Sequence, residues 1–191
     1  LYCLMDFLNK YNHKKNIRFA SFKFALEVAK KRNLKIFVET GCARGKKKLF
    51  FFSKINWKDG MSTMIFSEYV KFVDGSLTTC DIEKENIKNA IKFVKEGKEH
   101  VNFIVDDSLN FLSNFSKNID FLYLDSLDGQ FSEASEHQSK EIKIAIKKLN
   151  KNSLVLLDDK GSKTNFSINY LLENGYKILN ETNEQVLLSL I

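Results

Sequence analysis

Short apolar runs alternate with amphipathic helical patterns along most of the chain, and this alternation limits the folds that it can adopt. We expect strands at 34–38, 76–80, 101–105, 119–124 and 153–157, and helices at 62–73, 83–96, 108–115, 133–149 and 164–173. In the clearest helix, apolar residues recur at the spacing of one helix face from Ile87 to Val94, and Gly97 follows its end. The strand runs are apolar on both faces, as in strands buried inside a parallel sheet. The pattern therefore predicts a mostly parallel sheet between two layers of helices.

The two ends of the chain complete this fold. Residues 176–179 and 185–190 predict a closing antiparallel pair, and residues 18–32 predict an amphipathic helix ahead of the first strand. With 191 residues and no repeat, one domain is expected over 1–191, with N-terminal helices over about 1–32. The predicted fold class is α/β. It is a Rossmann-like three-layer αβα sandwich, in which a mostly parallel seven-stranded sheet ends in a C-terminal antiparallel hairpin.

Charge, cysteine content and hydrophobicity limit the partners and the cellular location that we expect. The net charge is +6, but the Lys residues are scattered and the densest run is Lys46–Lys48, so a solvated surface is favoured over an RNA-binding patch. We therefore expect no nucleic-acid partner. Cys3, Cys42 and Cys80 are isolated, which fits reduced thiols. No apolar run approaches the roughly 20 residues of a membrane span and no signal peptide is visible, so we expect a cytoplasmic protein without membrane contact; a homodimer is left open.

Acidic residues follow the end of every predicted parallel strand. They are Glu39, Asp81, Asp106–Asp107, Asp125 and Asp158–Asp159. Any single one could be a helix cap or a solvated turn residue. Together they favour a site, because ligands of open parallel sheets bind beyond the carboxyl ends of the strands.

The residue types at this edge suit a nucleoside ligand. Gly41 lets the backbone turn sharply and approach a ligand closely. Asp81, followed by Ile82, is placed to accept hydrogen bonds from both ribose hydroxyls, as acidic residues do in dinucleotide sites. Asp107 can accept a hydrogen bond from an adenine amine, and the Ser108 backbone N–H can donate to the ring.

The ordered set of motifs resembles class I S-adenosylmethionine (SAM)-dependent methyltransferases, in particular the catechol-type and bacterial small-molecule O-methyltransferase group. The motifs are Glu39-Thr40-Gly41, Gly60-Met61-Ser62-Thr63, Thr79-Cys80-Asp81, Asp107-Ser108, Leu124-Asp125-Ser126 and Leu157-Asp158-Asp159, over roughly residues 34–190. The resemblance implies SAM as the cofactor, held by Glu39, Thr40, Gly41, Gly60, Ser62, Thr63, Asp81, Ile82, Asp107, Ser108 and Asp125. It implies O-methylation of a small acceptor, which we expect to be anionic or sugar-like.

The first cofactor loop departs from the family pattern of repeated glycines. Ala43 stands at the middle glycine, Lys-rich sequence follows Gly45, and the next helix begins only near Gly60. We therefore expect residues 42–59 to form an inserted loop without regular structure. Structureless loops of this length are usually functional or disordered, so a lid over the substrate and a mobile surface loop are both left open.

Three residues are candidates for catalysis. Asp125 is expected on the acceptor side of the sulfonium. His137 lies near the start of a helix that packs on the sheet and could act as a base near neutral pH, although a surface histidine is the alternative. Lys160 could polarise the acceptor oxygen.

The resemblance also bears on metal dependence. Catechol-type enzymes hold a divalent cation with an Asp after strand four and an Asp-Asn pair after strand five. Asp125 matches the first, but Lys160 stands where Asn is expected, and an ammonium group would repel Mg²⁺. We therefore predict no metal, with Asp125, Asp158 and Asp159 as an alternative all-carboxylate Mg²⁺ site, or with Lys160 in place of the cation.

Two other functions fit parts of the pattern. An NAD-linked oxidoreductase would share Gly41 and Asp81, but the interval from Glu39 to Asp81 is long and G-x-G-x-x-G is absent. An RNA methyltransferase is supported only by the net charge and the basic segment 42–59. A domain that has lost its chemistry is disfavoured by the retained carboxylates.

Overall fold

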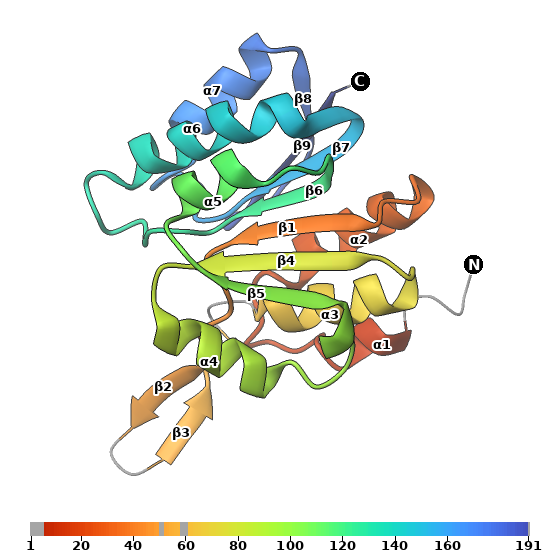
Figure 1. Cartoon of the computed structure of the whole chain (residues 1–191), viewed down its shortest axis with the longest axis vertical. Coiled ribbons are helices and arrows are strands. Elements are labelled where there is room, and N and C mark those ends of the chain that lie inside the picture. Colours follow the sequence, from red (N-terminus) through yellow and green to blue (C-terminus); the bar gives the residue numbers. More distant parts are fainter. Residues whose placement is uncertain (1–5, 50–51, 58–60, 191) are drawn as a thin grey trace.

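One seven-stranded sheet organises the chain in the computed structural model, which describes residues 6–49, 52–57 and 61–190 (Figure 1). The strands, in the order β5-β4-β1-β6-β7-β9-β8, are β5 (Val101–Val105), β4 (Ser76–Asp81), β1 (Ile36–Thr40), β6 (Ile119–Leu124), β7 (Leu149–Leu157), β9 (Val186–Leu190) and β8 (Tyr176–Glu181). The first five run parallel, and β9 pairs antiparallel with both β7 and β8. The predicted fold class, including the terminal hairpin, is confirmed.

Helices cover both faces of this sheet, as Figure 1 shows. They are α1 (Asp6–Asn9), α2 (Phe19–Lys31), α3 (Ser62–Phe72), α4 (Lys84–Phe93), α5 (Ser108–Asn114), α6 (Ala134–Ala145) and α7 (Asn165–Glu173). Side chains of α1, α2 and α3 pack in one hydrophobic cluster, and side chains of α5, α6 and α7 pack in another on the opposite face. The longest described helix, α2, has 13 residues, so none of the described helices could cross a bilayer.

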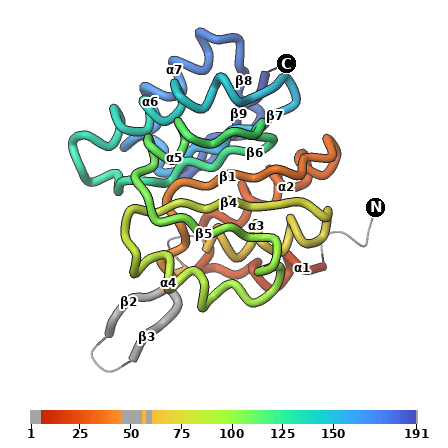
Figure 2. The backbone as a smooth tube through the Cα atoms, viewed as in Figure 1, coloured from red at the N-terminus to blue at the C-terminus, as the bar shows by residue number. Residues whose placement is uncertain are grey.

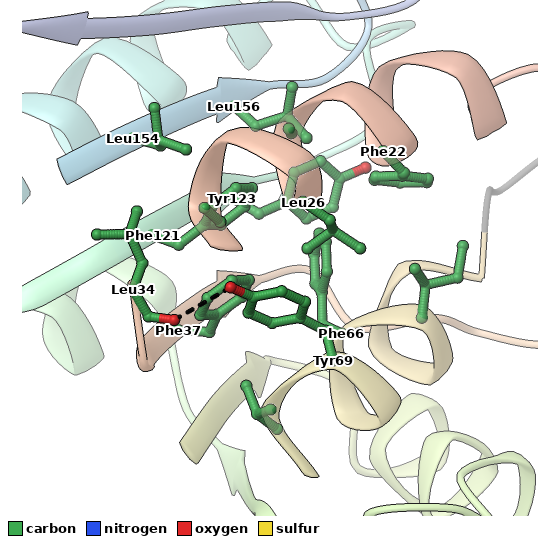
Figure 3. Packing of buried hydrophobic residues seen from close by; sticks show 14 of the residues in the cluster. Phe22, Leu26, Leu34, Phe37, Phe66, Tyr69, Phe121, Tyr123, Leu154 and Leu156 are labelled. Carbon is green, nitrogen blue, oxygen red and sulfur yellow. Dashed lines mark hydrogen bonds between the residues drawn. The ribbon is translucent and has the colours of Figure 1, made fainter. Parts of the chain in front are cut away.

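Alternate side chains of the central strands enter these two clusters, because successive residues of a strand point to opposite faces. Phe37 of β1 lies in the cluster with α2 and α3, whereas its neighbour Val38 lies in the other cluster. The rings of Phe37 and Phe121 stack with centroids 4.4 Å apart, and the Tyr69 hydroxyl donates to the Leu34 carbonyl (Figure 3). This packing fixes the register of β1 against β6, whose carboxyl ends border the candidate site.

The order of strands reverses at β1. β4 and β5 lie on one side of β1, and β6 to β9 extend on the other side (Figure 2). In open α/β sheets such a reversal marks the crevice where ligands bind. All the predicted strand-end carboxylates lie at the carboxyl ends of β1, β4, β5, β6 and β7.

Two elements differ from the prediction. Residues 42–59 are not without regular structure, because β2 (Lys46–Leu49) and β3 (Phe52–Ile55) pair as an antiparallel hairpin. The helix expected over 133–149 ends at Ala145, followed by a 3₁₀ turn over Ile146–Lys148, and β7 begins at Leu149. A helical pattern cannot reveal this boundary, because Ile146 and Leu149 are partly buried against the same cluster as the helix.

Candidate functional site

A cavity of about 480 Å³ opens at the carboxyl ends of β1, β4, β5 and β6. It is lined by Gly41, Cys42, Arg44, Cys80, Asp81, Ile82, Glu83, Asn86, Asp107, Ser108, Asp125, Ser126, Leu127, Asp128, Phe131 and His137. Three of the lining side chains are large, apolar and exposed, namely Ile82, Leu127 and Phe131. The cavity is within the size range of small-molecule sites and joins apolar walls to a few charged groups, as such sites commonly do.

The carboxylate of Asp81 is held in a fixed orientation at the end of β4. Its Oδ1 accepts from the Glu83 backbone N–H at 2.8 Å and from the Asn86 side-chain amide at 3.1 Å. Its Oδ2 accepts from the Cys42 backbone N–H at 3.3 Å, which ties it to the loop after β1. Asn86, which sequence reasoning missed, therefore sets the direction in which Asp81 faces the cavity.

Asp107 begins α5 as its N-cap residue. Its Oδ1 accepts from the backbone N–H groups of Leu109 and Asn110, at 3.0 and 3.1 Å. This is the ordinary role of an aspartate at a helix start. Since Asp107 and Ser108 also line the cavity, the cap places both residues at its wall.

His137 joins a small polar group beside α5. Its Nε2 lies 2.9 Å from the Ser108 hydroxyl and 3.8 Å from Oε1 of Glu141. Glu141 is fully buried and accepts from the Ser126 hydroxyl at 2.6 Å. His137 is therefore not an isolated surface histidine, since it lines the cavity and contacts a second cavity residue.

Glu39 lies behind the cavity rather than in its wall. Its fully buried carboxylate accepts from the hydroxyls of Ser62, Thr63 and Thr79, at 2.5, 2.7 and 2.6 Å. The Thr63 hydroxyl in turn accepts from the Ala43 backbone N–H at 2.8 Å. Glu39 thus ties the start of α3 and strand β4 to the loop after β1.

Burial raises the pKa of Glu39 to about 7, against the opposing effect of its three hydroxyl donors. The folded protein therefore binds this proton more tightly than the unfolded chain does, and stability falls as the pH rises from about 4.5 to 7 and above. We expect this group to lower the free energy of unfolding by about 3 kcal/mol between pH 5 and pH 8. Glu39→Gln should remove that part of the pH dependence, measured by urea unfolding at both pH values.

The exposed carboxylate of Glu27 on α2 supplies the matched control, because Glu27→Gln should leave the pH dependence as it is in the wild type. Identical pH dependence in the wild type and in Glu39→Gln would contradict the raised pKa of Glu39.

The loop after β1 touches the end of β6 at Gly41. This glycine has a φ of 79°, and a Cβ at its position would lie 2.3 Å from the Asp125 carbonyl oxygen. The Gly41 backbone N–H donates to the Cys80 carbonyl, and the Asp125 N–H donates to the Thr40 carbonyl, both at 2.8 Å. Glycine is therefore required both by the backbone conformation and by the close approach of the two loops that border the cavity.

Two buried cations pair with a cluster of three aspartates next to the cavity. Carboxylate oxygens of Asp125, Asp158 and Asp159 lie within 4.8 Å of one another. Arg18 pairs with Asp158 at 2.7 Å and with Asp159 at 2.9 Å. Lys163 pairs with Asp125 at 2.9 Å and with Asp159 at 3.2 Å. We call these five residues the ion cluster.

The ion cluster shifts the pKa of its members in opposite directions. Burial alone would raise the pKa of Asp158, but the Arg18 guanidinium and the Lys163 ammonium hold it below its usual value. Burial and the Asp158 carboxylate raise the pKa of Asp125 well above its usual value, although Lys163 opposes this. Asp158 is thus the fixed anion of the ion cluster, and Asp125 is the member that gains a proton more readily.

The predicted site residues divide into three groups. The residues of the first group line the cavity; they are Gly41, Asp81, Ile82, Asp107, Ser108, Asp125 and His137. The residues of the second group are buried and are not among the lining residues of the cavity; they are Glu39, Thr40, Ser62 and Thr63. Gly60 lies outside the described residues. Lys160 does not line the cavity either; its ammonium pairs with Glu181 at 2.6 Å. The lysine that reaches Asp125 is instead Lys163.

The segment 42–59 reaches the cavity through its first residues. Arg44 lines the cavity and pairs with Asp128, which lies beyond β6, at 2.9 Å. Trp57, near the other end of the segment, packs edge-on against His13 with ring centroids 4.4 Å apart. Cys42 is buried, and desolvation and the charges of Asp81 and Glu39 raise the pKa of its thiol, which disfavours the reactive thiolate form.

Comparison with protein families decides the class of the site. A family profile described as a methyltransferase domain matches residues 38–160, well over half of the chain. The chain belongs to this methyltransferase family. The predicted class I SAM-dependent methyltransferase is confirmed, and the NAD-linked alternative is disfavoured. A comparison with curated protein sequences found no match.

Solved structures of methyltransferases share the fold of this domain. The SAH-bound methyltransferase PaMTH1 of Podospora anserina has a TM-score of 0.65 at 12% identity, over 97% of this chain and 88% of that one. The O-methyltransferase TomG of Streptomyces achromogenes, in complex with SAM, has a TM-score of 0.65 at 13% identity, over 97% and 89%. An rRNA methylase of Streptococcus thermophilus has a TM-score of 0.61 at 13% identity, over 94% and 99%. The methyltransferase fold is therefore common to enzymes described for different acceptors.

Proposed function

We propose that this methyltransferase transfers the methyl group of SAM to a hydroxyl oxygen of a small acceptor. The observation that carries the proposal is the cavity at the reversal of strand order, where an oriented carboxylate, apolar walls and the ion cluster meet. Its volume of about 480 Å³ suits a ligand of the size of SAM at one end and the reacting group of an acceptor at the other.

The described residues offer partners for the nucleoside part of SAM. Asp81 would accept from the two ribose hydroxyls, because Asn86 and the Cys42 N–H already fix its carboxylate at the wall. Ile82, with a relative exposure of 66%, offers an apolar surface next to Asp81 on which an adenine ring could lie. Asp107 and Ser108, held at the start of α5, would form hydrogen bonds with the polar edge of that ring.

The acceptor side of the reaction belongs to Asp125. When bound, SAM supplies a methyl group on a sulfonium sulfur, which is already a good leaving group. Transfer to the acceptor oxygen would break the carbon–sulfur bond of SAM, and a residue of this chain would take the hydroxyl proton as the base. Asp125 lines the cavity, and burial and the Asp158 carboxylate raise its pKa, which strengthens it as a proton acceptor. His137 remains the second candidate for this role.

Arg44 is the residue of the cavity wall that could bind an anionic acceptor. The guanidinium of Arg44 lies in the wall and is about two-fifths exposed, so an acceptor carboxylate or phosphate could compete with Asp128 for it. Arginine is well suited to such planar recognition. The structural neighbours include proteins described as rRNA methylases, so RNA is kept as the alternative acceptor.

We expect label from methyl-labelled SAM to enter small hydroxyl acceptors and not RNA. The assay would offer a catechol, an anionic phenol and a sugar phosphate in parallel with total RNA, and would measure S-adenosylhomocysteine (SAH) formation. Arg44→Gln should raise KM roughly tenfold for the anionic acceptor and leave KM for a neutral one unchanged, because it removes about 1.4 kcal/mol of charge attraction. Lys147→Gln, on the turn that follows α6 and away from the cavity, is the control. Label found in RNA alone would refute the proposal.

A further inference from the structure

The ammonium of Lys163 is enclosed by oxygen atoms. Its side chain is fully buried, and its Nζ contacts Asp125 Oδ1 at 2.9 Å and Asp159 Oδ2 at 3.2 Å. It also donates to the backbone carbonyls of Ser126 at 3.3 Å and Leu127 at 3.4 Å. Two carboxylates and two carbonyls around one cation form the kind of donor set that a hard divalent cation takes in proteins.

The three aspartates taken alone would suit a divalent metal, but their surroundings do not. Their oxygens are close enough to share one ion, yet Arg18 and Lys163 already contribute two fixed positive charges to them. With all five side chains ionised, three negative and two positive charges leave a net charge of −1. A divalent cation would have to enter beside two buried cations at distances where like charges repel strongly. The residues present therefore do not fit a divalent cation.

We propose that Lys163 occupies the position of a divalent cation at the acceptor side of this site, so that the site binds no divalent metal. The inference rests on the proposed methyltransferase function only for its location. The lysine comes from the segment between β7 and α7, and its ammonium reaches the end of β6 through the ion cluster.

Lys163 acts in this account as a positioning residue. It holds one oxygen of Asp125, whose side chain is 20% exposed toward the cavity, and so fixes the direction of that carboxylate. Through the Ser126 and Leu127 carbonyls it also fixes the loop after β6. Leu127 has a φ of 44°, which is uncommon for a residue other than glycine and persists only when surrounding contacts enforce it. A metal ion would orient the same groups, so the lysine makes it unnecessary.

Arg18 completes the ion cluster from the opposite side. Its guanidinium bonds both oxygens of Asp158, at 2.7 and 2.8 Å, and one oxygen of Asp159 at 2.9 Å. Gln185 donates to Asp158 Oδ1 at 2.7 Å. Asp158 is thus engaged away from the cavity, which it does not line, and is not available as a metal ligand.

Binding of Mn²⁺ alone tests this proposal without any methyl transfer. The amplitude of the free Mn²⁺ signal in electron paramagnetic resonance would be followed for the wild type, Lys163→Ala, Asp159→Asn and the control Lys160→Ala. We expect the wild type to leave as much Mn²⁺ free as Asp159→Asn does. Lys163→Ala should bind Mn²⁺ roughly tenfold more tightly or better, because it leaves the oxygen cage without its cation. Lys160→Ala should behave as the wild type.

Two results would overturn the proposal. One is Mn²⁺ binding by the wild type that Asp159→Asn abolishes. The other is a folded Lys163→Ala variant, checked by circular dichroism, that gains no affinity for Mn²⁺. If alanine prevents folding, Lys163→Gln takes its place, and the comparison of the wild type with Asp159→Asn decides the question by itself. If the wild-type protein did not bind SAH, the proposed function would be contradicted, but the Mn²⁺ result would be unaffected.

Discussion

We expect Asp81→Ala to lower the affinity for SAH about 100-fold or more. Asp81 would accept hydrogen bonds from two ribose hydroxyls, and each hydrogen bond to a charged group contributes about 1.5–3 kcal/mol. Even the lower value for both bonds corresponds to a factor of about 100 in Kd. Calorimetric titration of SAH into the wild type and the variant measures the difference directly.

A neighbouring carboxylate provides the control for this prediction. Asp106 also ends a strand and accepts from the Asn110 side chain, but it does not line the cavity. Asp106→Ala should therefore bind SAH like the wild type. Asp81→Asn keeps the shape of the side chain and tests whether the charge is needed. If Asp81→Ala bound SAH with unchanged affinity, Asp81 would be only a turn residue that orders the loop after β1.

The second large effect concerns the ion cluster. We expect Arg18→Leu to lower the free energy of unfolding by about 3–5 kcal/mol, because it leaves the buried Asp158 carboxylate without its main cation. For a domain of this size the loss corresponds to a drop in Tm of roughly 10 °C. Arg18 holds the pKa of Asp158 below its usual value in the folded protein. The contribution of this pair to the free energy of unfolding is therefore present above about pH 4, the pKa of an aspartate in the unfolded chain, and is lost as the pH falls.

Two variants separate the ion pair from general damage to α2. Arg32→Leu removes an arginine just after the other end of α2, where it bonds the Asn152 carbonyl and the Ser189 hydroxyl, and should cost less than Arg18→Leu, about 1–2 kcal/mol. Asp158→Leu added to Arg18→Leu should recover part of the loss, because no charge then stays buried alone. Thermal unfolding of the four proteins gives the comparison. Equal losses for Arg18→Leu and Arg32→Leu would show that the buried pair does not stabilise the fold.

The fold could be predicted from the sequence because its strands are strongly marked. Each central strand is an apolar run that ends at a carboxylate, as at Asp81 and Asp125, and these runs match β4 and β6 closely. The hairpin β2–β3 could not be predicted, because neither the sequence KKKL of β2 nor FSKI of β3 has the alternation of a half-buried strand. The end of α6 was missed for a related reason, since the residues after it remain partly buried.

Most of the site residues that could be predicted closely follow the end of a strand. Asp81, Asp107 and Asp125 reach the cavity for that reason. The partners that orient them come from elsewhere in the chain. Arg18 is 140 residues from Asp158, and no local pattern distinguishes it from the other basic residues. One feature of the sequence indicated Lys163, namely its position four residues after Asp159. Lys160, however, lies directly after Asp159 and was the lysine chosen from the sequence.

Calorimetric titration of the wild-type protein with SAH, SAM and NAD is the most direct test of the central claim, that the cavity beside Asp81 is a SAM site. The account predicts saturable heat with SAH and SAM at one site per chain, and no binding of NAD. Folded protein that gives no heat with either sulfur ligand, or that binds NAD alone, would contradict it.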